Sequence, residues 1–275
     1  MSCADITAIV LTYNEEKNIS DCLESLRPLV KRIIVVDSFS TDGTKAICQS
    51  FGAEFYEHVF ETHSKQFEYG LSNFNITTKW VIRLDADERL TEESRNELEL
   101  LCKQHSDDDV NGIVLRFKLF FLGKYLKHGG VYPVKKMQVF KYGTAHIEMK
   151  EMDEHIVLDK GTSIDCKQDC LHHDCKSIFD WVEKHNKYST KEANDYLSNN
   201  VGNINLLDRN AKKKAKNKRL FYQLKPGLRA KIYYFYRYIF KGGFLDGKQG
   251  KYYAFLQAYW YRYLVDIKIY EAKEK

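Results

Sequence analysis

The length, composition and charge of the chain describe a folded protein and exclude several classes. Its 275 residues are 44% hydrophobic and include only three prolines, which suits a substantial buried core and not a disordered chain. No apolar run approaches the roughly 20 residues that a membrane-spanning helix requires, and the start of the chain does not resemble a signal peptide. We therefore expect a cytoplasmic protein. The net charge of +5, without a recognised nucleic-acid-binding module, argues against nucleic acid as a partner.

The first half of the chain predicts an open α/β sheet. Short apolar runs at residues 6–11, 32–36 and 80–84 are typical of strands that are buried on both faces. Helices are predicted over residues 19–29 and 45–51, and an acidic helix start is expected at Thr91. This alternation indicates a central, mostly parallel sheet flanked by helices.

Polar clusters follow three of these strands, at residues 12–15, 37–42 and 85–88. In parallel sheets ligands bind beyond the carboxyl ends of the strands, so the three clusters are expected to meet at one crevice. Asp85 and Asp87 form an all-oxygen donor pair that suits Mg²⁺ or Mn²⁺. Each cluster has a simpler interpretation, because acid pairs are common in solvated turns and Asp37 could cap a helix or a turn.

Three segments resemble the signatures of family-2, inverting glycosyltransferases: Val10–Glu16, Val35–Thr44 and Leu84–Glu88. Two later segments, Met152–His155 and Trp181–Tyr188, are similar to the subgroup that builds bacterial lipopolysaccharide core, capsular or exopolysaccharide glycans. The resemblance covers essentially the whole chain. It implies a GT-A (nucleotide-diphospho-sugar transferase) fold, and the residues that follow add a helical, aromatic and basic C-terminal extension.

The resemblance also implies a donor site. Thr12, Tyr13 and Glu15 would line the nucleoside pocket, and Asp37 would accept a hydrogen bond from the base or the ribose. Asp85 would face the ribose or the donor sugar.

The resemblance further implies that Asp87 is the main protein ligand of a Mg²⁺ or Mn²⁺ ion that bridges the two phosphates. Asp85 would be a second ligand of that ion. His172 is a candidate for completing the coordination of that ion. Lys65 and Gln66 are candidates for contact with the donor, although a solvated helix face is the simpler interpretation of Lys65.

Inversion requires a general base near the acceptor hydroxyl, on the side opposite the leaving group. The cluster of Asp153, Glu154 and His155 is the best candidate, with a slight preference for Glu154 over Asp153. An ordinary solvated acidic turn is the alternative. Residues 112–142, with alternating strand patterns, would form the acceptor side.

Cysteine usage favours free thiols. The chain has seven cysteines, an odd number, which suits a reducing compartment. Cys166, Cys170, His172, His173 and Cys175 could supply zinc ligands, but their spacing is not that of a common zinc motif. Zinc is therefore disfavoured.

The expected organisation is a catalytic domain over residues 1–190, with a donor half (1–110) and an acceptor half (111–190), followed by a helical extension over 191–275. The extension contains a basic run at 211–219. It also contains aromatic residues at 233–240 and an apolar helix face formed by Phe255, Leu256, Tyr259, Trp260, Tyr263, Leu264 and Ile267. These features predict contact with an anionic membrane surface, on the inner face of the cytoplasmic membrane. The alternative is packing onto the catalytic domain or onto a second subunit, as in a homo-oligomer.

The sequence thus predicts a metal-dependent, inverting hexosyltransferase. It would move a sugar from a nucleotide-diphosphate donor, UDP being preferred, to a hydroxyl of a glycan or lipid-linked glycan acceptor. One alternative is a sugar-phosphate nucleotidyltransferase, which is disfavoured because no Gly-rich strand-to-helix loop opens the chain. Another alternative is a non-catalytic protein that binds a nucleotide sugar or a polyanion.

Overall fold

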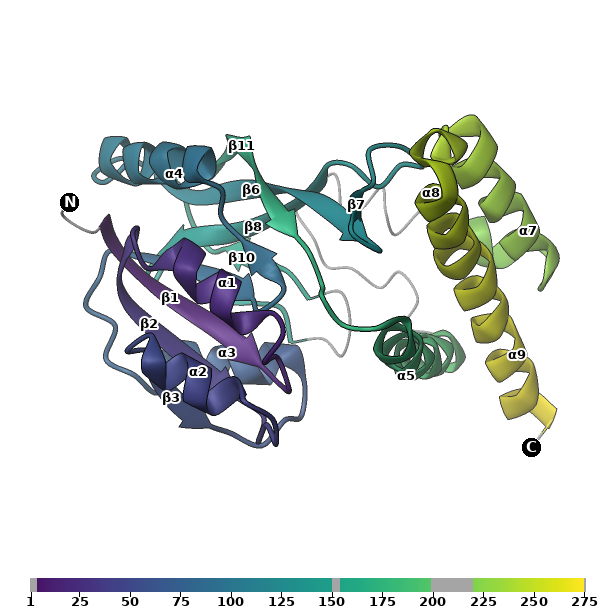
Figure 1. The fold of residues 1–275 in the computed structure, drawn as a ribbon, viewed down its shortest axis with the longest axis horizontal. Coiled ribbons are helices and arrows are strands. Elements are labelled where there is room, and N and C mark those ends of the chain that lie inside the picture. Colours follow the sequence, from purple (N-terminus) through teal and green to yellow (C-terminus); the bar gives the residue numbers. More distant parts are fainter. Residues whose placement is uncertain (1–3, 150–153, 199–219, 275) are drawn as a thin grey trace. The chain divides into compact units, whose positions relative to one another are not determined.

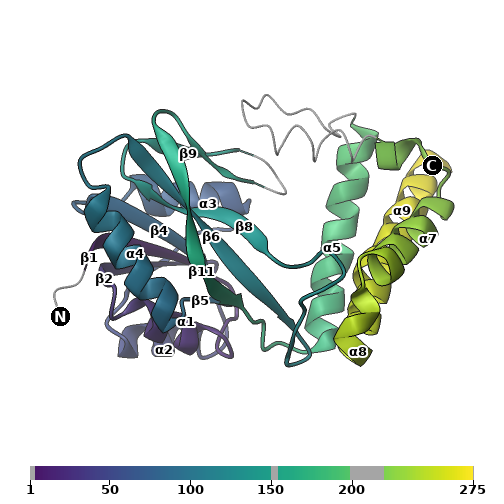
Figure 2. The ribbon, with the colours of Figure 1, turned by 90° about the horizontal axis from the view of Figure 1, so that it is seen from above.

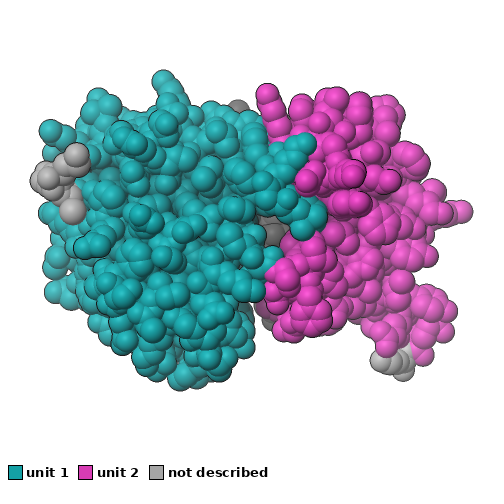
Figure 3. Space-filling model, viewed as in Figure 1, with its two compact units in different colours: residues 1–125, 132–176 teal, residues 126–131, 177–275 magenta. Residues whose placement is uncertain are grey.

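The computed structural model describes residues 4–149, 154–198 and 220–274. The chain forms two compact units, which are coloured separately in Figure 3. Unit 1 comprises Met1–Tyr125 and Tyr132–Lys176, and unit 2 comprises Leu126–Val131 and Ser177–Lys275. Residue 190, at which the sequence predicts the end of the catalytic domain, lies within helix α5 (Ile178–Leu197).

Unit 1 is built on a nine-stranded sheet with the order β3-β2-β1-β4-β8-β6-β11-β5, and β7 pairs with β6. Its first part is parallel: β1 (Ala4–Thr12) lies between β2 (Val30–Asp37) and β4 (Trp80–Asp85), and β3 (Glu54–Glu57) pairs with β2. The apolar runs predicted as strands are therefore strands.

The second part of the sheet is mixed. Strand β8 (Val134–Lys141) is antiparallel to both β4 and β6 (Val110–Phe121), and β11 (Thr162–His172) is parallel to β6. The remaining strands are short: β5 (Glu88–Arg89), β7 (Lys124–Tyr125), β9 (Ala145–Ile147) and β10 (Ile156–Leu158). Strands β9 and β10 form a separate antiparallel hairpin.

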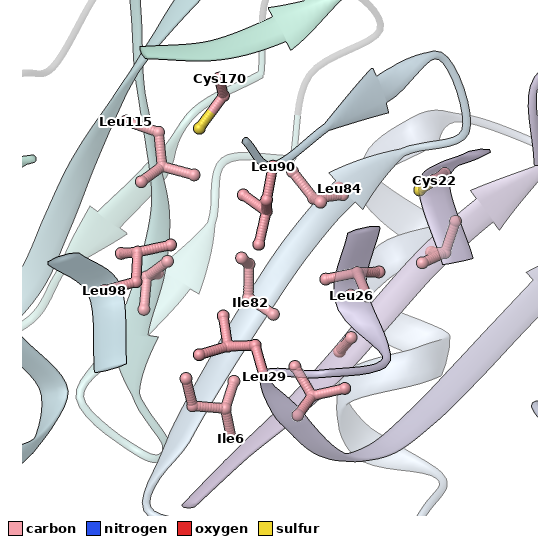
Figure 4. Packing of buried hydrophobic residues seen from close by; sticks show 14 of the residues in the cluster. Ile6, Cys22, Leu26, Leu29, Ile82, Leu84, Leu90, Leu98, Leu115 and Cys170 are labelled. Atoms are coloured by element: carbon pink, nitrogen blue, oxygen red, sulfur yellow. The ribbon is translucent and has the colours of Figure 1, made fainter. Parts of the chain in front are cut away.

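Helices cover both faces of this sheet (Figure 1; Figure 2), because successive strand side chains point to opposite faces. On one face, side chains such as Ile6, Ala8 and Val10 of β1 pack with α1 (Ile19–Leu26), α2 (Thr44–Ser50) and α4 (Glu92–Gln104). Figure 4 shows part of this cluster, including Leu26, Ile82 and Leu98.

The opposite face is covered by α3 (His63–Ser72) and by the β9–β10 hairpin. Phe67 of α3 is fully buried there, together with Ile9 of β1 and Ile34 of β2. Each aliphatic or aromatic side chain that becomes fully buried contributes about 1.5–3 kcal/mol. Packing on both faces therefore holds the parallel strands, and with them the site, in place.

Unit 2 is helical. Its described elements after α5 are α7 (Leu228–Phe235), η1 (Tyr236–Phe240), η2 (Gly243–Asp246), α8 (Gly247–Tyr253), η3 (Ala254–Trp260) and α9 (Tyr261–Glu274). Helix α5 packs against α9, with Ala193, Tyr261, Val265 and Ile269 at the centre of the contact. Arg229 of α7 and Asp266 of α9 form a buried ion pair.

The apolar helix face predicted for the C-terminal extension differs from the face that is buried. The buried side chains of η3 and α9 include Ala254, Ala258 and Tyr261, whereas Phe255 and Tyr263 of the predicted face are exposed. The helical segment formed by η3 and α9 has apolar residues on more than one side, so the spacing of these residues could not show which side would be buried. The basic run at 211–219 lies outside the described residues. None of the described helices combines the length and the apolarity needed to cross a bilayer.

Candidate active site

The site begins with the register of the parallel strands. Thr12 of β1 is paired with Asp37 of β2, and Leu11 of β1 is paired with Asp85 of β4. The three polar clusters predicted to converge therefore leave the sheet at the same edge. Each is positioned by a strand whose side chains are buried on both faces, so the edge is a rigid platform.

Asp37 organises the centre of this edge. Its side chain is fully buried, and Oδ1 accepts hydrogen bonds from Thr12 Oγ1 at 2.7 Å and from Ser40 Oγ at 2.5 Å. Oδ2 accepts a hydrogen bond from the Ser40 backbone N–H at 2.6 Å. Both oxygens are thus engaged within the protein, and a base or ribose would have to share them.

The loops after β1 and β2 are locked together and strained. The Asn14 N–H donates to Ser40 Oγ at 2.8 Å, and the Thr41 N–H donates to Asn14 Oδ1 at 2.8 Å. Asn14 and Phe39 have φ angles of 52° and 60°, in the left-handed region that non-glycine residues rarely adopt. Such positions cost about 1–3 kcal/mol each and collect at functional sites. The aromatic rings of Tyr13 and Phe39 are 58% and 52% exposed on these loops, and Phe39 was not among the predicted site residues.

Glu15 anchors the segment that follows β11. Its carboxylate accepts hydrogen bonds from Lys176 Nζ at 2.6 Å and from Asn18 Nδ2 at 2.8 Å. Burial raises the pKa of Glu15, and the nearby Lys176 charge only partly opposes this. Asn18 also bonds to Asp174, so these contacts hold the residues after His172 against the start of α1. Lys176 and Asn18 are further site residues that the sequence did not single out.

Gln66 and Lys65 occupy different environments on α3. Gln66 is buried, and its Nε2 donates to Ser38 Oγ at 3.0 Å while its Oε1 lies 2.8 Å from His58 Nδ1. Gln66 therefore supports the loop after β2. Lys65 is exposed and pairs with Glu61, as expected of a solvated helix face.

The acidic corner after β4 contains its own cations. The Arg83 guanidinium lies 3.5 Å from Asp85 Oδ1 and 2.9 Å from Glu154 Oε1. Lys136 of β8 reaches the same corner, with Nζ 2.6 Å from Glu88 Oε1 and 3.8 Å from Asp85 Oδ2. Arg83 could have been identified as a candidate site residue from the sequence, because it is a charged residue inside an apolar run. Lys136 could be identified only once the order of the strands was known.

These cations determine the protonation of the corner. Burial opposes ionisation of Asp85, but the charges of Arg83 and Lys136 outweigh it and lower the pKa of Asp85 to about 2. Burial raises the pKa of Glu88, and Lys136 offsets part of that rise. For Lys136 burial alone would lower the pKa, yet Glu88 and Asp85 raise it overall, so the ammonium stays charged.

Asp87 and His172 meet beside this corner. His172 is the last residue of β11 and pairs with Glu88 of β5, which brings its Nε2 to 3.2 Å from Asp87 Oδ2. The His173 N–H donates to the Asp87 carbonyl oxygen at 2.9 Å and fixes the same junction. Burial acts to lower the pKa of His172, but the Asp87 carboxylate raises it overall. Two of the three predicted metal ligands are therefore adjacent.

The corner contains part of a donor set for one hard divalent ion. The corner holds four carboxylates and two cations, which come from Asp85, Asp87, Glu88, Glu154, Arg83 and Lys136. When these six are ionised and His172 is neutral, the net charge is −2, which one divalent ion would neutralise. Within the described residues no group of three His, Cys, Asp or Glu side chains is assembled for a metal. Asp87 and His172 would thus supply part of a coordination shell that substrate oxygens and water complete, as is common for Mg²⁺.

The candidate base residues are only partly described. Asp153 lies outside the described residues, whereas Glu154 precedes β10 and its carboxylate is held by Arg83. The side chain of Glu154 is 11% exposed. His155 pairs with Glu148, 3.2 Å away, and does not join the Arg83 contact.

The cysteine and histidine residues near the end of β11 do not form a zinc site in the described part of the chain. Cys166 and Cys170 lie in the hydrophobic core, where burial raises the pKa of both thiols. His172 instead contacts Asp87, and Cys175 is an exposed free thiol. All the described cysteines are free, in line with the prediction.

The fold and the site define a mixed α/β protein with a cluster of acidic side chains at the carboxyl ends of its parallel strands. The chain belongs to glycosyl transferase family 2, whose family model matches residues 7–152. The predicted family and the predicted GT-A fold are confirmed by this match. The prediction of an enzyme of the glycosyltransferase class is confirmed at the level of the family.

The chain is similar in sequence to other proteins described as glycosyltransferases. It is 26% identical over 199 residues to the lipopolysaccharide core biosynthesis glycosyltransferase LpsC of Rhizobium meliloti (strain 1021), covering 70% of this chain and 72% of LpsC. It is 33% identical over 103 residues to an uncharacterized glycosyltransferase of Rickettsia felis, covering 38% of this chain and 36% of that protein. The match thus spans about a third of the length of the Rickettsia relative.

Two solved structures align with part of the chain. Glucosyl-3-phosphoglycerate synthase from Mycobacterium tuberculosis, in complex with Mn²⁺, UDP and glucosyl-3-phosphoglycerate, aligns with 43% of this chain and 44% of its own chain. The alignment has 21% sequence identity and a TM-score of 0.34. Mannosyl-3-phosphoglycerate synthase from Rubrobacter xylanophilus aligns with 41% of this chain and 40% of its own, at 20% identity and a TM-score of 0.35.

Proposed function

We propose that the protein transfers a sugar from a nucleotide-diphosphate donor, with UDP preferred, to a hydroxyl group of a glycan, with inversion at the transferred carbon. The observation that carries this proposal is the edge at which Thr12, Asp37 and Asp85 meet, with the Asp87–His172 pair beside it. A nucleoside diphosphate needs a rigid polar cradle for its nucleoside and a positive charge for its phosphates. This end of the sheet offers the polar cradle, and its acidic side chains suit a metal ion that would provide the positive charge.

In the proposed donor site the loops after β1 and β2 hold the nucleoside. The exposed ring of Tyr13 would stack on the base, and Thr12 would line the pocket, with its buried hydroxyl group donating to Asp37. Asp37, engaged by Thr12 and Ser40, acts mainly by holding both loops in their strained geometry. Glu15 fixes the segment that follows the proposed metal ligand His172.

Asp87 and His172 are the residues that would hold Mg²⁺ or Mn²⁺, with Asp85 facing the ribose or the donor sugar. The bound ion would stabilise the charge that develops on the leaving diphosphate. Arg83 and Lys136 keep Asp85 ionised and fix its orientation. When the four carboxylates of the corner are ionised and His172 is neutral, these two cations leave a net negative charge that one divalent ion would balance.

The proton of the acceptor hydroxyl group would pass to a carboxylate of the Asp153–Glu154 segment. Glu154 is oriented by the Arg83 guanidinium, which also touches Asp85. A base fixed in this way is linked through one side chain to the donor corner. The choice between Asp153 and Glu154 stays a proposal.

The proposed acceptor is a bacterial surface glycan, growing or attached to a lipid. The similarity to LpsC, a lipopolysaccharide core biosynthesis glycosyltransferase, supports this class. A lipid-linked acceptor would bring the enzyme to the inner face of the cytoplasmic membrane, so the proposal includes a peripheral location there. Self-association remains the alternative use of the exposed apolar residues of unit 2.

The test is a screen of the full chain against nucleotide sugars with Mn²⁺ or Mg²⁺, which measures release of the nucleoside diphosphate and transfer to glycan acceptors. We expect metal-dependent turnover with at least one donor, and its loss in Asp87→Asn while the variant stays folded. Asp107→Asn is a matched control, because the Asp107 side chain is 91% exposed and pairs with Lys79, which precedes β4 at the end opposite Asp85. If no nucleoside diphosphate is bound or released, the proposed function is wrong.

A further inference from the structure

The outward side of α7 and η1 is unusually apolar. Leu228, Ile232, Phe235 and Ile239 follow one another at spacings of four, three and four residues, which places them on one side of a helix. Their exposed fractions are 50%, 46%, 57% and 47%. A helix on the surface of a water-soluble domain usually presents charged or polar residues at such positions.

The apolar surface continues past Ile239. Phe240 is 80% exposed and Phe244, in η2, is 48% exposed. We call the six side chains at positions 228, 232, 235, 239, 240 and 244 the apolar strip. Large apolar side chains exposed together on neighbouring elements mark a site of interaction with a protein or a membrane.

The inner side of the same helix is already used. Arg229 and Ala230 are buried within unit 2, where Arg229 Nε donates to Asp266 Oδ1 at 2.7 Å. At the other end, Arg237 Nε donates to the Gly129 carbonyl oxygen at 2.5 Å. These contacts fix which side of α7 and η1 faces the unit, so the apolar strip is the side that is left over.

The exposed charged side chains of the segment that carries the apolar strip have one sign. Between residues 220 and 262 the only acidic residue of the sequence is Asp246. Asp246 is 5% exposed and binds His128, with Oδ1 2.8 Å from the His128 ring. The exposed charged side chains of this stretch are lysines, at positions 225, 231, 241, 248 and 251.

We propose that the apolar strip docks on an anionic lipid bilayer, with α7 and η1 lying in the plane of the interface. The apolar side chains would enter the boundary between headgroups and acyl chains, and the surrounding lysines would meet the lipid phosphates. In a symmetric contact between two copies the same stretch would face these lysines, and it exposes no acidic side chain to match them.

An exposed tyrosine beside the apolar strip suits the same depth. Tyr236 lies one helical turn from both Ile232 and Phe240, and its ring is exposed. The Lys241 ammonium lies 5.5 Å from the centre of that ring. Tyrosine favours the membrane–water interface, because its ring is apolar and its hydroxyl group is polar.

This inference deepens the peripheral location included in the proposed function, but it does not depend on sugar transfer. The two are tested by different measurements. Vesicle binding reports on the apolar strip, and release of the nucleoside diphosphate in detergent-free buffer reports on the transferase site.

The experiment is flotation of the full chain with vesicles of phosphatidylcholine alone or of equal parts phosphatidylcholine and phosphatidylglycerol. We expect the protein to float with the anionic vesicles and to be released by salt. The double variant Phe235→Gln and Ile239→Gln should bind at least about tenfold more weakly. The double variant Lys231→Glu and Lys248→Glu should weaken binding to the anionic vesicles and leave any binding to vesicles of phosphatidylcholine alone unchanged.

Phe179→Gln is the matched control, because Phe179 is a 76% exposed phenylalanine on α5, outside the apolar strip. It should float as the wild type does. Absence of flotation of the wild type, or flotation of the Phe235→Gln and Ile239→Gln variant equal to that of the wild type, would overturn the proposal. So would a wild-type dimer in solution that this variant converts to a monomer, because the strip would then be a contact between copies.

Discussion

Replacement of Lys136 by methionine is the sharpest test of the acidic corner. The change keeps most of the side-chain length and removes the ammonium that lies 2.6 Å from Glu88 Oε1. Glu88 is fully buried, so the variant leaves a carboxylate in the interior without its closest cation. Removing one partner of a buried ion pair costs about 3–5 kcal/mol.

The expected loss is smaller here, because the Lys136 side chain is 34% exposed and water screens part of the interaction. We expect the free energy of unfolding to fall by about 2–3 kcal/mol near neutral pH. Thermal or urea unfolding measures this loss. Lys135→Met is the matched control: Lys135 is the neighbouring residue, its partner Asp165 is exposed, and its loss should cost under about 1 kcal/mol.

The pH dependence separates this explanation from a simple packing defect. The pKa of Glu88 is already raised by burial, and loss of Lys136 removes a charge that opposes the rise. A carboxyl group whose pKa is raised on folding destabilises the protein as the pH rises above its unfolded pKa. The stability gap between Lys136→Met and the wild type should therefore narrow as the pH falls and Glu88 becomes protonated.

A second variant completes the test. Glu88→Gln combined with Lys136→Met removes both charges, and it should recover much of the stability lost in Lys136→Met. A gap that does not change with pH, together with no recovery in the double variant, would refute the electrostatic explanation.

Three further predictions concern other parts of the molecule. His172→Ala should raise the Mn²⁺ concentration needed for half-maximal turnover by about tenfold or more, as a metal titration would show, and an unchanged titration would remove His172 from the coordination shell. Arg229→Met should destabilise unit 2 by about 3–5 kcal/mol in urea unfolding, because it leaves Asp266 buried without its partner; a loss under about 1 kcal/mol would contradict this. Phe39→Gly should relieve about 1 kcal/mol of backbone strain at φ 60° while weakening UDP binding in calorimetry, and unchanged UDP affinity would exclude Phe39 from the donor site.

The strands and the convergence of their ends could be predicted because they depend on local patterns. The apolar runs that became β1, β2 and β4 can be read without knowing their neighbours. Thr91 likewise caps α4, where a helix start was expected, with Ser94 completing a capping box. Parallel pairing then follows from the alternation of strands and helices.

Lys136 could not be predicted in this way. Its strand contains two adjacent lysines, and successive side chains point to opposite faces, so the register decides which one turns inward. Only the placement of β8 beside β4 and β6 brings Lys136 to Glu88 while Lys135 pairs with Asp165 at the surface. Contacts between residues 48 positions apart are set by tertiary structure.

Arg83 links the two halves of the proposed reaction. Its guanidinium lies 3.5 Å from Asp85, on the donor side, and 2.9 Å from Glu154, on the proposed acceptor side. Because Arg83 is buried in β4, it can hold both carboxylates only in one geometry. A base released from Arg83 would gain freedom but lose its orientation toward the donor corner. The ion pair therefore suits a site in which the proposed acceptor carboxylate is positioned before the acceptor arrives, and in which the charge of Arg83 is shared between Asp85 and the proposed base.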